Sequence, residues 1–180
     1  HRFLCLVCIL MVALTTGVSG APVVNPAVQV TTDRSDQITP AIDGDWLVWV
    51  DGRHGGADIY LYDFAAGKET RITNGTAVAL WPDISGSRIV WQDNRLGDPE
   101  IWLYDAAAGN ETRITNETGG QVMPAIDGDR VVWLDRRAGN AGGVYAMNLT
   151  TRATVRVSAG PVEGDPLIVS PDVSGGTIVW

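Results

Sequence analysis

The stretch that decides the fold, "SRIVWQDNRLGDPEIWLYD" at residues 87–105, has a near copy, "DWLVWVDGRHGGADIYLYD", at residues 45–63. In both stretches an apolar run leads through an Asp-x-Arg-x-Gly turn to a second apolar run that ends in Tyr-Asp. Two stretches this similar, in the same order, predict a structural unit that is copied along the chain and stacked.

Prolines and tryptophans give the period of this unit. Pro40, Pro82 and Pro124 are 42 residues apart, and the next equivalent, Pro171, follows after 47 residues. The same three spacings separate Trp49, Trp91, Trp133 and Trp180. The five extra residues of the last interval fall in connections, where a stacked unit tolerates insertions.

Each copy of the unit reads as four short strands. In the first copy they are expected at 40–42, 47–49, 59–62 and 70–73, with Asp43-Gly44-Asp45 as a hairpin turn between the first two. The second and third strands are apolar at consecutive positions, so both of their faces must be covered, whereas the fourth alternates with polar residues and is expected at a wetted edge. Four antiparallel strands in about 40–45 residues are typical of a β-propeller blade, while a β-solenoid, the competing repeat architecture, has shorter parallel coils.

We therefore predict an all-β chain, a β-propeller of four-stranded antiparallel blades with repeats of 42 residues and about three complete blades plus partial ones. The expected propeller domain, 21–180, divides into a lone strand at 28–32, blades at 38–74, 80–116 and 122–159, and a partial blade at 167–180. The lone strand matches the fourth strand of a blade, and we expect it to complete the last blade of a ring. Because propellers have about four to eight blades, the ring is incomplete here, and we expect the chain to be the N-terminal piece of a longer protein.

The N-terminus predicts export. Arg2 precedes an apolar run at 3–14, and small residues follow, so we expect a signal peptide at 1–20. An uncleaved membrane anchor is the alternative, although the run is shorter than the roughly 20 residues that span a bilayer. Both cysteines of the chain lie in this run, so the mature protein would have no disulfide and no thiolate site. The expected location is secreted, periplasmic or on the cell surface.

The chain is acidic, with 21 Asp and Glu against 13 Lys and Arg and a net charge of −8. Such a protein is repelled by phosphate backbones, so nucleic acid is not expected as a partner. We expect a protein or an envelope polymer as partner, no cofactor, and no membrane span in the mature chain.

The Asp-x-Arg-x-Gly turn is the first candidate site. Its aspartates, Asp51, Asp93 and Asp135, could form a ring of carboxylates for a cation or a polar ligand. The turn recurs in every copy, however, whereas a catalytic site is needed once. We therefore favour a structural role, in which the aspartate caps turn amides and pairs with the arginine.

The turn after the second strand and the connection after the fourth lie at the same end of a four-stranded antiparallel blade. Arg53, Arg95 and Arg137 should therefore share a face with the long insertion that contains Glu163 and Asp165. We take this face as the candidate binding surface. Catalytic and metal-binding residues are not predicted. The sequence also contains four candidate N-glycosylation acceptors near turns: Asn74, Asn110, Asn116 and Asn148.

The repeat resembles the repeats of TolB-type, WD-like β-propellers of exported and cell-surface proteins. In the first copy the resemblance rests on Asp51, Arg53, Gly55, and the segments 58–63 and 70–73. The second copy supplies the equivalents Asp93, Arg95, Gly97, 100–105 and 112–115. The third copy departs from the pattern at Gly143, Asn148 and Arg152.

The resemblance implies a non-catalytic extracytoplasmic scaffold that binds a protein or an envelope polymer. Related propellers also belong to serine peptidases, so the alternative is the propeller portion of an exported hydrolase whose catalytic domain lies beyond residue 180. The 180 residues contain no Gly-x-Ser-x-Gly elbow, and His54 is the single histidine after the predicted signal peptide. A sugar-active enzyme would need His or acidic clusters that the sequence does not display.

Overall fold

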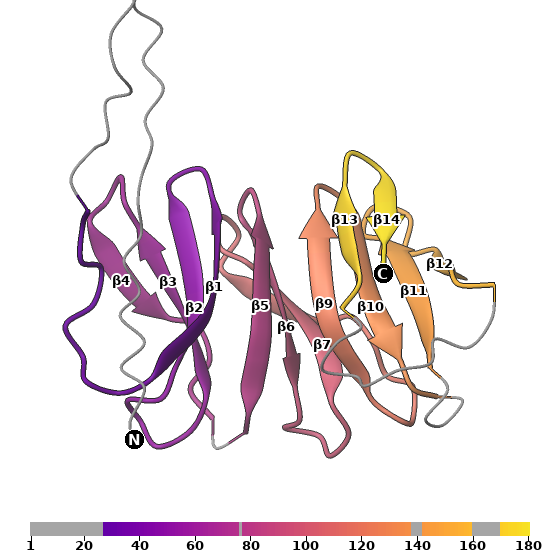
Figure 1. The fold of residues 1–180 in the computed structure, drawn as a ribbon, viewed down its shortest axis with the longest axis horizontal. Coiled ribbons are helices and arrows are strands. Elements are labelled where there is room, and N and C mark those ends of the chain that lie inside the picture. Colours follow the sequence, from indigo (N-terminus) through magenta and orange to yellow (C-terminus); the bar gives the residue numbers. More distant parts are fainter. Residues whose placement is uncertain (1–26, 76, 138–141, 160–169) are drawn as a thin grey trace, which may run out of the picture.

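The computed structural model describes residues 27–75, 77–137, 142–159 and 170–180. These residues form three four-stranded antiparallel sheets and one two-stranded hairpin (Figure 1). The described part of the chain contains no helix that is long and apolar enough to cross a membrane.

Each four-stranded sheet is built from one copy of the repeat, with the strands in chain order across the sheet. The first blade contains β1 (Gln37–Asp43), β2 (Trp46–Asp51), β3 (Asp58–Asp63) and β4 (Lys68–Arg71). The second blade contains β5 (Ala79–Ser85), β6 (Arg88–Asp93), β7 (Glu100–Asp105) and β8 (Asn110–Arg113). The third blade contains β9 (Gln121–Asp127), β10 (Arg130–Asp135), β11 (Gly143–Asn148) and β12 (Thr154–Arg156). The hairpin contains β13 (Asp172–Ser174) and β14 (Thr177–Val179).

The first strand of each blade begins about three residues earlier than the sequence predicts, because it continues across a β-bulge. Thr39, Trp81 and Met123, each directly before a proline, have positive φ angles of 48°, 56° and 54°. The register of the ladder shifts at the same three places. Proline cannot donate to a ladder, which is why it predicts a strand end, and the bulge removes that conflict by leaving the proline unpaired.

The blades are stacked face to face, as the two-sided apolar strands predict. In the middle strand β6, Ile89 and Trp91 face the first blade, whereas Val90 faces the third. All three side chains are fully buried. Burial of one such side chain contributes about 1.5–3 kcal/mol, so covering both faces is the main stabilising term of each blade.

The outermost strands β4, β8 and β12 are largely exposed or half-buried, which confirms the wetted edge expected for the fourth strand. The third strands differ from the prediction, because each is buried at its start and half-buried at its last two residues. Burial extends over Asp58–Leu61 in β3 but only over Glu100–Ile101 in β7.

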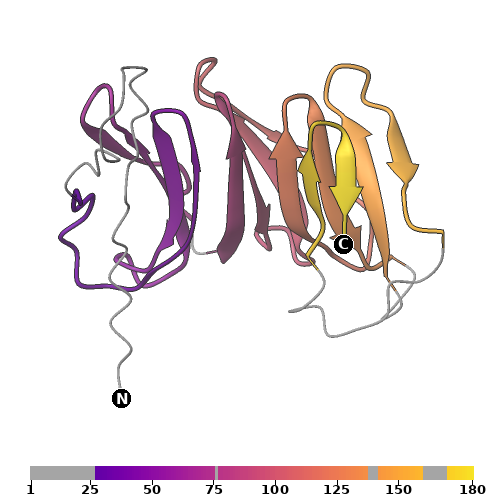
Figure 2. The same ribbon diagram turned by 45° about the horizontal axis from the view of Figure 1, so that its top comes forward.

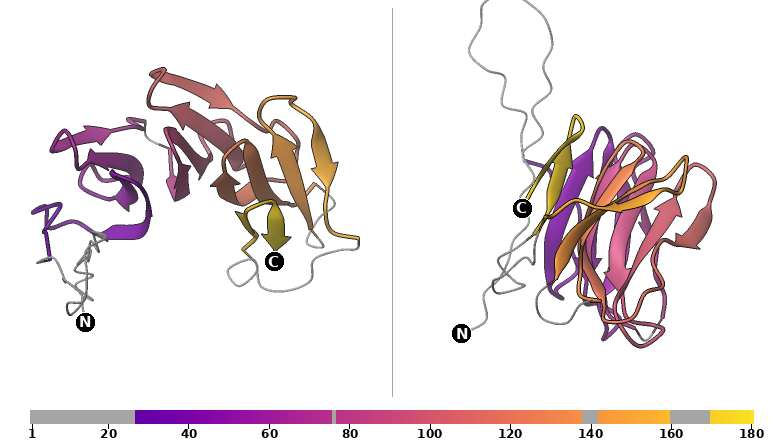
Figure 3. Two further views of the ribbon diagram at one scale, coloured as in Figure 1. Left: turned by 90° about the horizontal axis from the view of Figure 1, so that it is seen from above. Right: turned by 90° about the vertical axis from the view of Figure 1, so that its right-hand side faces the viewer.

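The three blades follow one another in an arc that does not close into a ring (Figure 3). Figure 2 shows the hairpin of β13 and β14 beside the third blade, where β13 contacts β9 and β10. Trp180, at the end of this hairpin, is 54% exposed, although Trp49, Trp91 and Trp133 at the equivalent positions are buried. The hairpin has no third and fourth strand in the described chain, so the position of Trp180 differs from that of its equivalents.

The segment 28–32, predicted as a lone strand that completes the last blade of a ring, pairs with none of the described blades. Within this segment only Val28 makes an isolated bridge, and the remaining residues belong to none of the described sheets. A strand exists only where a neighbouring strand exchanges backbone hydrogen bonds with it. Val30 packs against Leu47, Trp49 and Tyr60, on the face of the first blade that none of the other described blades covers.

Hydrogen bonds between hairpin tips join neighbouring blades along their first strands. Asp43 Oδ2 accepts from the backbone N–H of Gly86 at 2.6 Å, and Asp127 Oδ2 accepts from Gly175 at 2.7 Å. Deeper between the blades, Asp83 Oδ2 accepts from the Ile126 N–H at 2.7 Å. These contacts fix the angle between blades because each one joins a side chain to a backbone group of the next blade.

Asp83 should make stability depend on pH in an unusual direction. Burial raises the pKa of Asp83, the N–H donors of Ile126 and Ile84 only partly offset this, and the charges of Asp172 and Asp43 add to the increase. The folded state therefore holds the proton more tightly than the unfolded state, so this group costs stability as pH rises through its folded pKa.

We predict that Asp83→Asn, which keeps an acceptor for the Ile126 N–H, gives a melting temperature equal to or above that of the parent chain at pH 7. The difference should vanish below about pH 4, where the parent carboxyl is protonated in both states. Thermal unfolding of both chains from pH 3.5 to 7.5 measures it. A large loss of stability of the variant at pH 7 would contradict the assignment.

Candidate functional site

The turns between second and third strands lie beside the connections between blades. Ala57, in the β2–β3 turn, forms a parallel bridge with Val78 of the β4–β5 connection, and its carbonyl accepts from the Ala79 N–H at 2.9 Å. In the next blade the Gln121 N–H donates to the carbonyl of Pro99 at 2.7 Å. These elements form one surface at the lower edge of Figure 1, which we call the turn face and which comprises residues 52–57, 72–75, 77–78, 94–99, 114–120 and 136–137.

A buried carboxylate organises each turn on this face. In the first blade the Asp51 side chain is fully buried at the end of β2. Its Oδ1 accepts from the Arg53 backbone N–H and Nε, both at 2.9 Å, and its Oδ2 accepts from Arg53 Nη2 at 2.7 Å and from the Trp49 indole at 2.9 Å. The guanidinium then lies over the ring of Tyr60, with Cζ 4.3 Å from the ring centroid. The carboxylate thereby links the strand before the turn, through Trp49, to the turn itself, through Arg53.

The other two blades repeat this arrangement. Asp93 accepts from the Trp91 indole at 3.3 Å and from Arg95 Nη2 at 2.5 Å, and Arg95 lies 4.2 Å from the centroid of the Trp102 ring. In the third blade the donors to Asp135 are Trp133 and Arg137, at 3.2 Å and 2.7 Å, and the arginine lies over Tyr145. These contacts agree with the structural interpretation of the Asp-x-Arg turn.

Asp51 of the first blade and Asp135 of the third blade are held in the ionised form. Burial opposes the ionisation of Asp51, but hydrogen bonds from Arg53 and the Trp49 indole outweigh burial and lower its pKa. The same balance of burial against donors from Arg137 and Trp133 lowers the pKa of Asp135. Each carboxylate therefore serves as a permanent acceptor rather than as an acid or base near neutral pH.

Sequence reasoning finds the Asp–Arg pair but misses its other partners. The indole contact has a readable signal, since tryptophan stands two residues before the aspartate and both point to the same side of a strand. The arginine also pairs with a second carboxylate, which no sequence pattern within the turn predicts. This carboxylate belongs to Glu69 or Glu111, on the outermost strand of the blade. Arg53 Nη1 lies 2.6 Å from Glu69 and Arg95 Nη1 lies 2.6 Å from Glu111.

The third blade differs in this second carboxylate. Thr154 occupies the position of Glu69 and Glu111, and the second carboxylate near Arg137 among the described residues is the half-exposed Glu117 of the preceding connection, at 3.6 Å. Within the described part of the chain, Arg137 therefore has a more distant second carboxylate than Arg53 and Arg95.

A second ion pair closes the other side of the turns. Asp58 accepts from Arg71 Nη2 at 2.7 Å and from the Thr73 hydroxyl at 3.0 Å. Glu100, Arg113 and Thr115 form the same set in the second blade. In the third blade Gly143 replaces the acid, and a Cβ at this position would lie 2.8 Å from Arg156 Nε. The departure from the repeat pattern thus leaves room for an arginine beside the strand.

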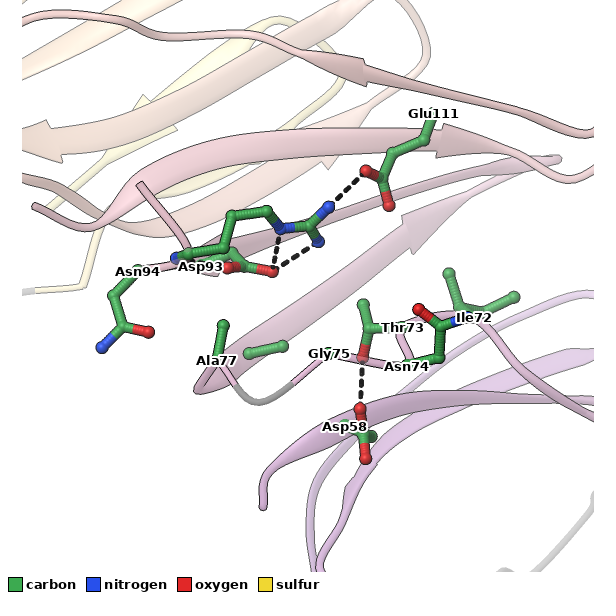
Figure 4. A pocket seen from close by; sticks show the side chains of 11 residues that line it. Asp58, Ile72, Thr73, Asn74, Gly75, Ala77, Asp93, Asn94 and Glu111 are labelled. Carbon is green, nitrogen blue, oxygen red and sulfur yellow. Dashed lines mark hydrogen bonds and ion pairs between the residues drawn. The ribbon is translucent and has the colours of Figure 1, made fainter. Parts of the chain in front are cut away.

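A cavity of about 650 Å³ opens between the first and second blades on the turn face (Figure 4). Asp58 and Thr73 lie on its first-blade side, and Asp93, Asn94 and Glu111 on its second-blade side. The complete lining is Asp58, Ile72, Thr73, Asn74, Gly75, Ala77, Ala79, Asp93, Asn94, Arg95 and Glu111. Its volume lies within the 300–1,000 Å³ that is usual for small-ligand sites.

The cavity depends on a residue that breaks the repeat. Position 79 holds alanine, whereas the equivalent positions hold Gln37 and Gln121, which are 7% and 0% exposed. Between the second and third blades the connection also comes close to the next turn, since a Cβ on Gly119 would lie 2.6 Å from the Arg136 carbonyl. The small side chain of Ala79 leaves space at this interface that a glutamine would occupy.

The remaining candidate residues are placed as follows. Glu163, Asp165 and the third Gly of the turn motif, Gly139, lie outside the described residues. His54 is exposed and stacks near Tyr60, with centroids 6.4 Å apart. Of the candidate glycosylation acceptors, Asn74, Asn110 and Asn116 are exposed, whereas Asn148 is half-buried and its Oδ1 accepts from the Thr151 N–H at 2.9 Å.

Comparison with solved structures identifies the fold. A protein of Agrobacterium tumefaciens assigned as TolB is 24% identical over 72% of this chain and 51% of its own, with a TM-score of 0.61. A puromycin-hydrolysing peptidase of Mycobacterium tuberculosis is 13% identical over 84% of this chain and 25% of its own, with a TM-score of 0.59. A chain of the nidogen–laminin complex is 15% identical over 71% of this chain and 51% of its own, with a TM-score of 0.52.

These likenesses establish a TolB-type β-propeller fold, as the repeat predicts. The chain spans about half the length of the TolB chain that it matches. No protein-family model matches the sequence, and no curated protein matches it. At these identities the comparisons concern the fold and not the role of the chain.

We predict that Asp135→Asn costs about 2–3 kcal/mol of unfolding free energy at pH 7, since an amide turns a donor toward the Trp133 indole and leaves Arg137 without its buried partner. The lowered pKa of Asp135 means that the parent chain begins to lose this advantage as pH falls below the ordinary aspartate value, so the difference between the two chains should narrow from about pH 4 downward.

Denaturant unfolding at pH 3.5 and 7 measures this difference. Asp129→Asn is the matched control, because Asp129 also pairs with an arginine, Arg88, but at an exposed site. The control should change stability little at either pH. Equal effects of the two substitutions would contradict the structural role of the buried carboxylate.

Proposed function

We propose that the chain is a non-catalytic binding scaffold that holds a protein or a cell-envelope polymer on its turn face. The observation that carries this proposal is that the blades, which are otherwise equivalent, differ from one another at and beside the turn face. Ala79 lines a cavity at one blade interface, and among the described residues Arg137 has no second carboxylate as close as those of Arg53 and Arg95. A surface that varies between stacked copies is free to acquire specificity, while the repeated Asp–Arg pairs hold its shape.

The comparisons support a binding role at the level of the fold. Two of the similar structures are a TolB-type protein and a component of the nidogen–laminin complex, which is an assembly of proteins. The apolar N-terminal run of the sequence favours export, so we place the proposed function outside the cytoplasm.

The second candidate is the propeller portion of an exported serine peptidase. The similarity to the puromycin-hydrolysing peptidase, which extends over 84% of this chain, favours it. This reading needs a catalytic domain in sequence outside these 180 residues. Determining the complete reading frame separates the two, because a Gly-x-Ser-x-Gly elbow followed by Asp and His would support the peptidase.

The proposed binding face predicts that Leu96→Asp weakens attachment of the chain to isolated cell envelopes at least tenfold. Leu96 is 59% exposed at the tip of the β6–β7 turn, where an apolar side chain can be buried by a partner. Co-sedimentation of purified protein with envelopes measures attachment, and protease treatment of the envelopes beforehand separates a protein partner from a polymer.

Val155→Asp is the matched control, since Val155 is also 59% exposed but lies on the outer strand β12. It should sediment as the parent chain does. Failure of the parent chain to sediment, or an equal loss with both variants, would refute a partner site on the turn face.

A further inference from the structure

We propose that the cavity between the first two blades receives a short polypeptide segment through a basic side chain, arginine or lysine. This inference rests on the proposed function and names the chemistry of the partner. It is carried by the shape of the cavity and by the groups that its walls leave available.

The charge of the walls favours a cation. Three carboxylates line the cavity, those of Asp58, Asp93 and Glu111, against the single guanidinium of Arg95. Arg71, which pairs with Asp58, is the only further cation bonded to these groups among the described residues. The chain as a whole carries a net charge of −8, which adds to the attraction.

The one arginine of the wall is not available to an anion. Its Nε and Nη2 donate to Asp93 at 2.9 and 2.5 Å, and its Nη1 donates to Glu111 at 2.6 Å, while the guanidinium lies over Trp102. An acidic ligand would have to compete with two carboxylates already in place. A phosphate or carboxylate ligand is therefore disfavoured.

The unused hydrogen-bonding groups suit a peptide. Only one oxygen of Glu111 is engaged, so the other has no hydrogen bond from any described residue and can accept from an ammonium or guanidinium. Asn94 Oδ1 accepts from the Val78 N–H at 2.9 Å, which leaves its amide NH₂ as a donor for a backbone carbonyl. Ile72, Ala77 and Ala79 supply an apolar floor for the methylene groups of a long basic side chain.

The size of the cavity argues for a segment rather than a single small ion. A volume of about 650 Å³ exceeds that of one side chain and accommodates two or three residues. The cavity lies at the interface where Ala79 replaces the buried glutamine of the other described blades. The repeated packing alone does not require such a space, which makes this interface a candidate for selection by a ligand.

The test titrates the purified chain with acetyl-Gly-Arg-Gly-amide by calorimetry. We expect saturable binding that weakens at least tenfold in Glu111→Gln, because a charge-assisted hydrogen bond is replaced by a neutral one. Glu69→Gln is the matched control, since Glu69 makes the same 2.6 Å contact to the arginine of its own turn but does not line the cavity. It should bind the peptide as the parent chain does.

Ala79→Gln provides an independent test, because it fills the cavity with the side chain that the other blades already bury at this position. It should abolish peptide binding, and thermal unfolding of each variant shows whether the fold is retained. If Ala79→Gln does not fold, Glu111→Gln and Glu69→Gln still decide the question.

Absence of saturable peptide binding, or equal binding to Glu111→Gln and the parent chain, overturns the inference. The same result follows if acetyl-Gly-Glu-Gly-amide binds as well, or if a disaccharide of N-acetylglucosamine binds instead, which would assign the cavity to a sugar. Attachment to envelopes that depends on Leu96 but not on the cavity would leave the proposed function standing while this inference fails.

Discussion

Every blade depends on covering both faces of its second strand. In β2, β6 and β10 consecutive residues are apolar and buried, so both faces of each sheet need cover from a neighbouring blade or from other parts of the chain. Each of these strands must nevertheless end and turn back toward solvent. The transition is made by an aspartate that is almost completely buried, held by an indole from two residues before it and a guanidinium from two residues after it. The need to satisfy that carboxylate fixes the turn, and the turn positions the candidate binding surface.

Much of this architecture is readable from spacing alone, because the constraint is periodic. A two-sided apolar strand, a hairpin turn and a repeat of 42 residues leave few alternatives to stacked antiparallel blades. The start of the first strand is not readable, since Pro40 suggests a strand end and the bulge at Thr39 overrides it. The segment 28–32 pairs with no described strand, and the reason is related. Pattern shows that a segment is suited to pairing, whereas a strand also needs a neighbour in space.

In the candidate site, too, features that are local in sequence were predictable, whereas features that depend on contacts between strands or blades were not. The Asp–Arg pair is local in sequence and was predictable from the types and spacing of its residues. Glu111 reaches Arg95 from another strand, and the cavity exists because Ala79 is smaller than Gln37 and Gln121. Neither feature has a motif, since each depends on which side chains meet between strands or blades. A comparison of equivalent positions in the three copies would nevertheless have singled out Ala79, as the one small residue in a series of glutamines.

That comparison also shows how a repeated fold can acquire specificity without losing stability. Stacking requires equivalent blades to present complementary faces, so substitutions within the apolar strands affect both neighbours at once. The turn face is relieved of this requirement, because each turn is closed by its own carboxylate and arginine. Threonine at position 154 changes the charge beside one turn, and alanine at position 79 reduces the volume of one side chain within the apolar core between the first two blades. In such a chain the residues at the turns can change what is bound, while the apolar strands continue to determine the fold.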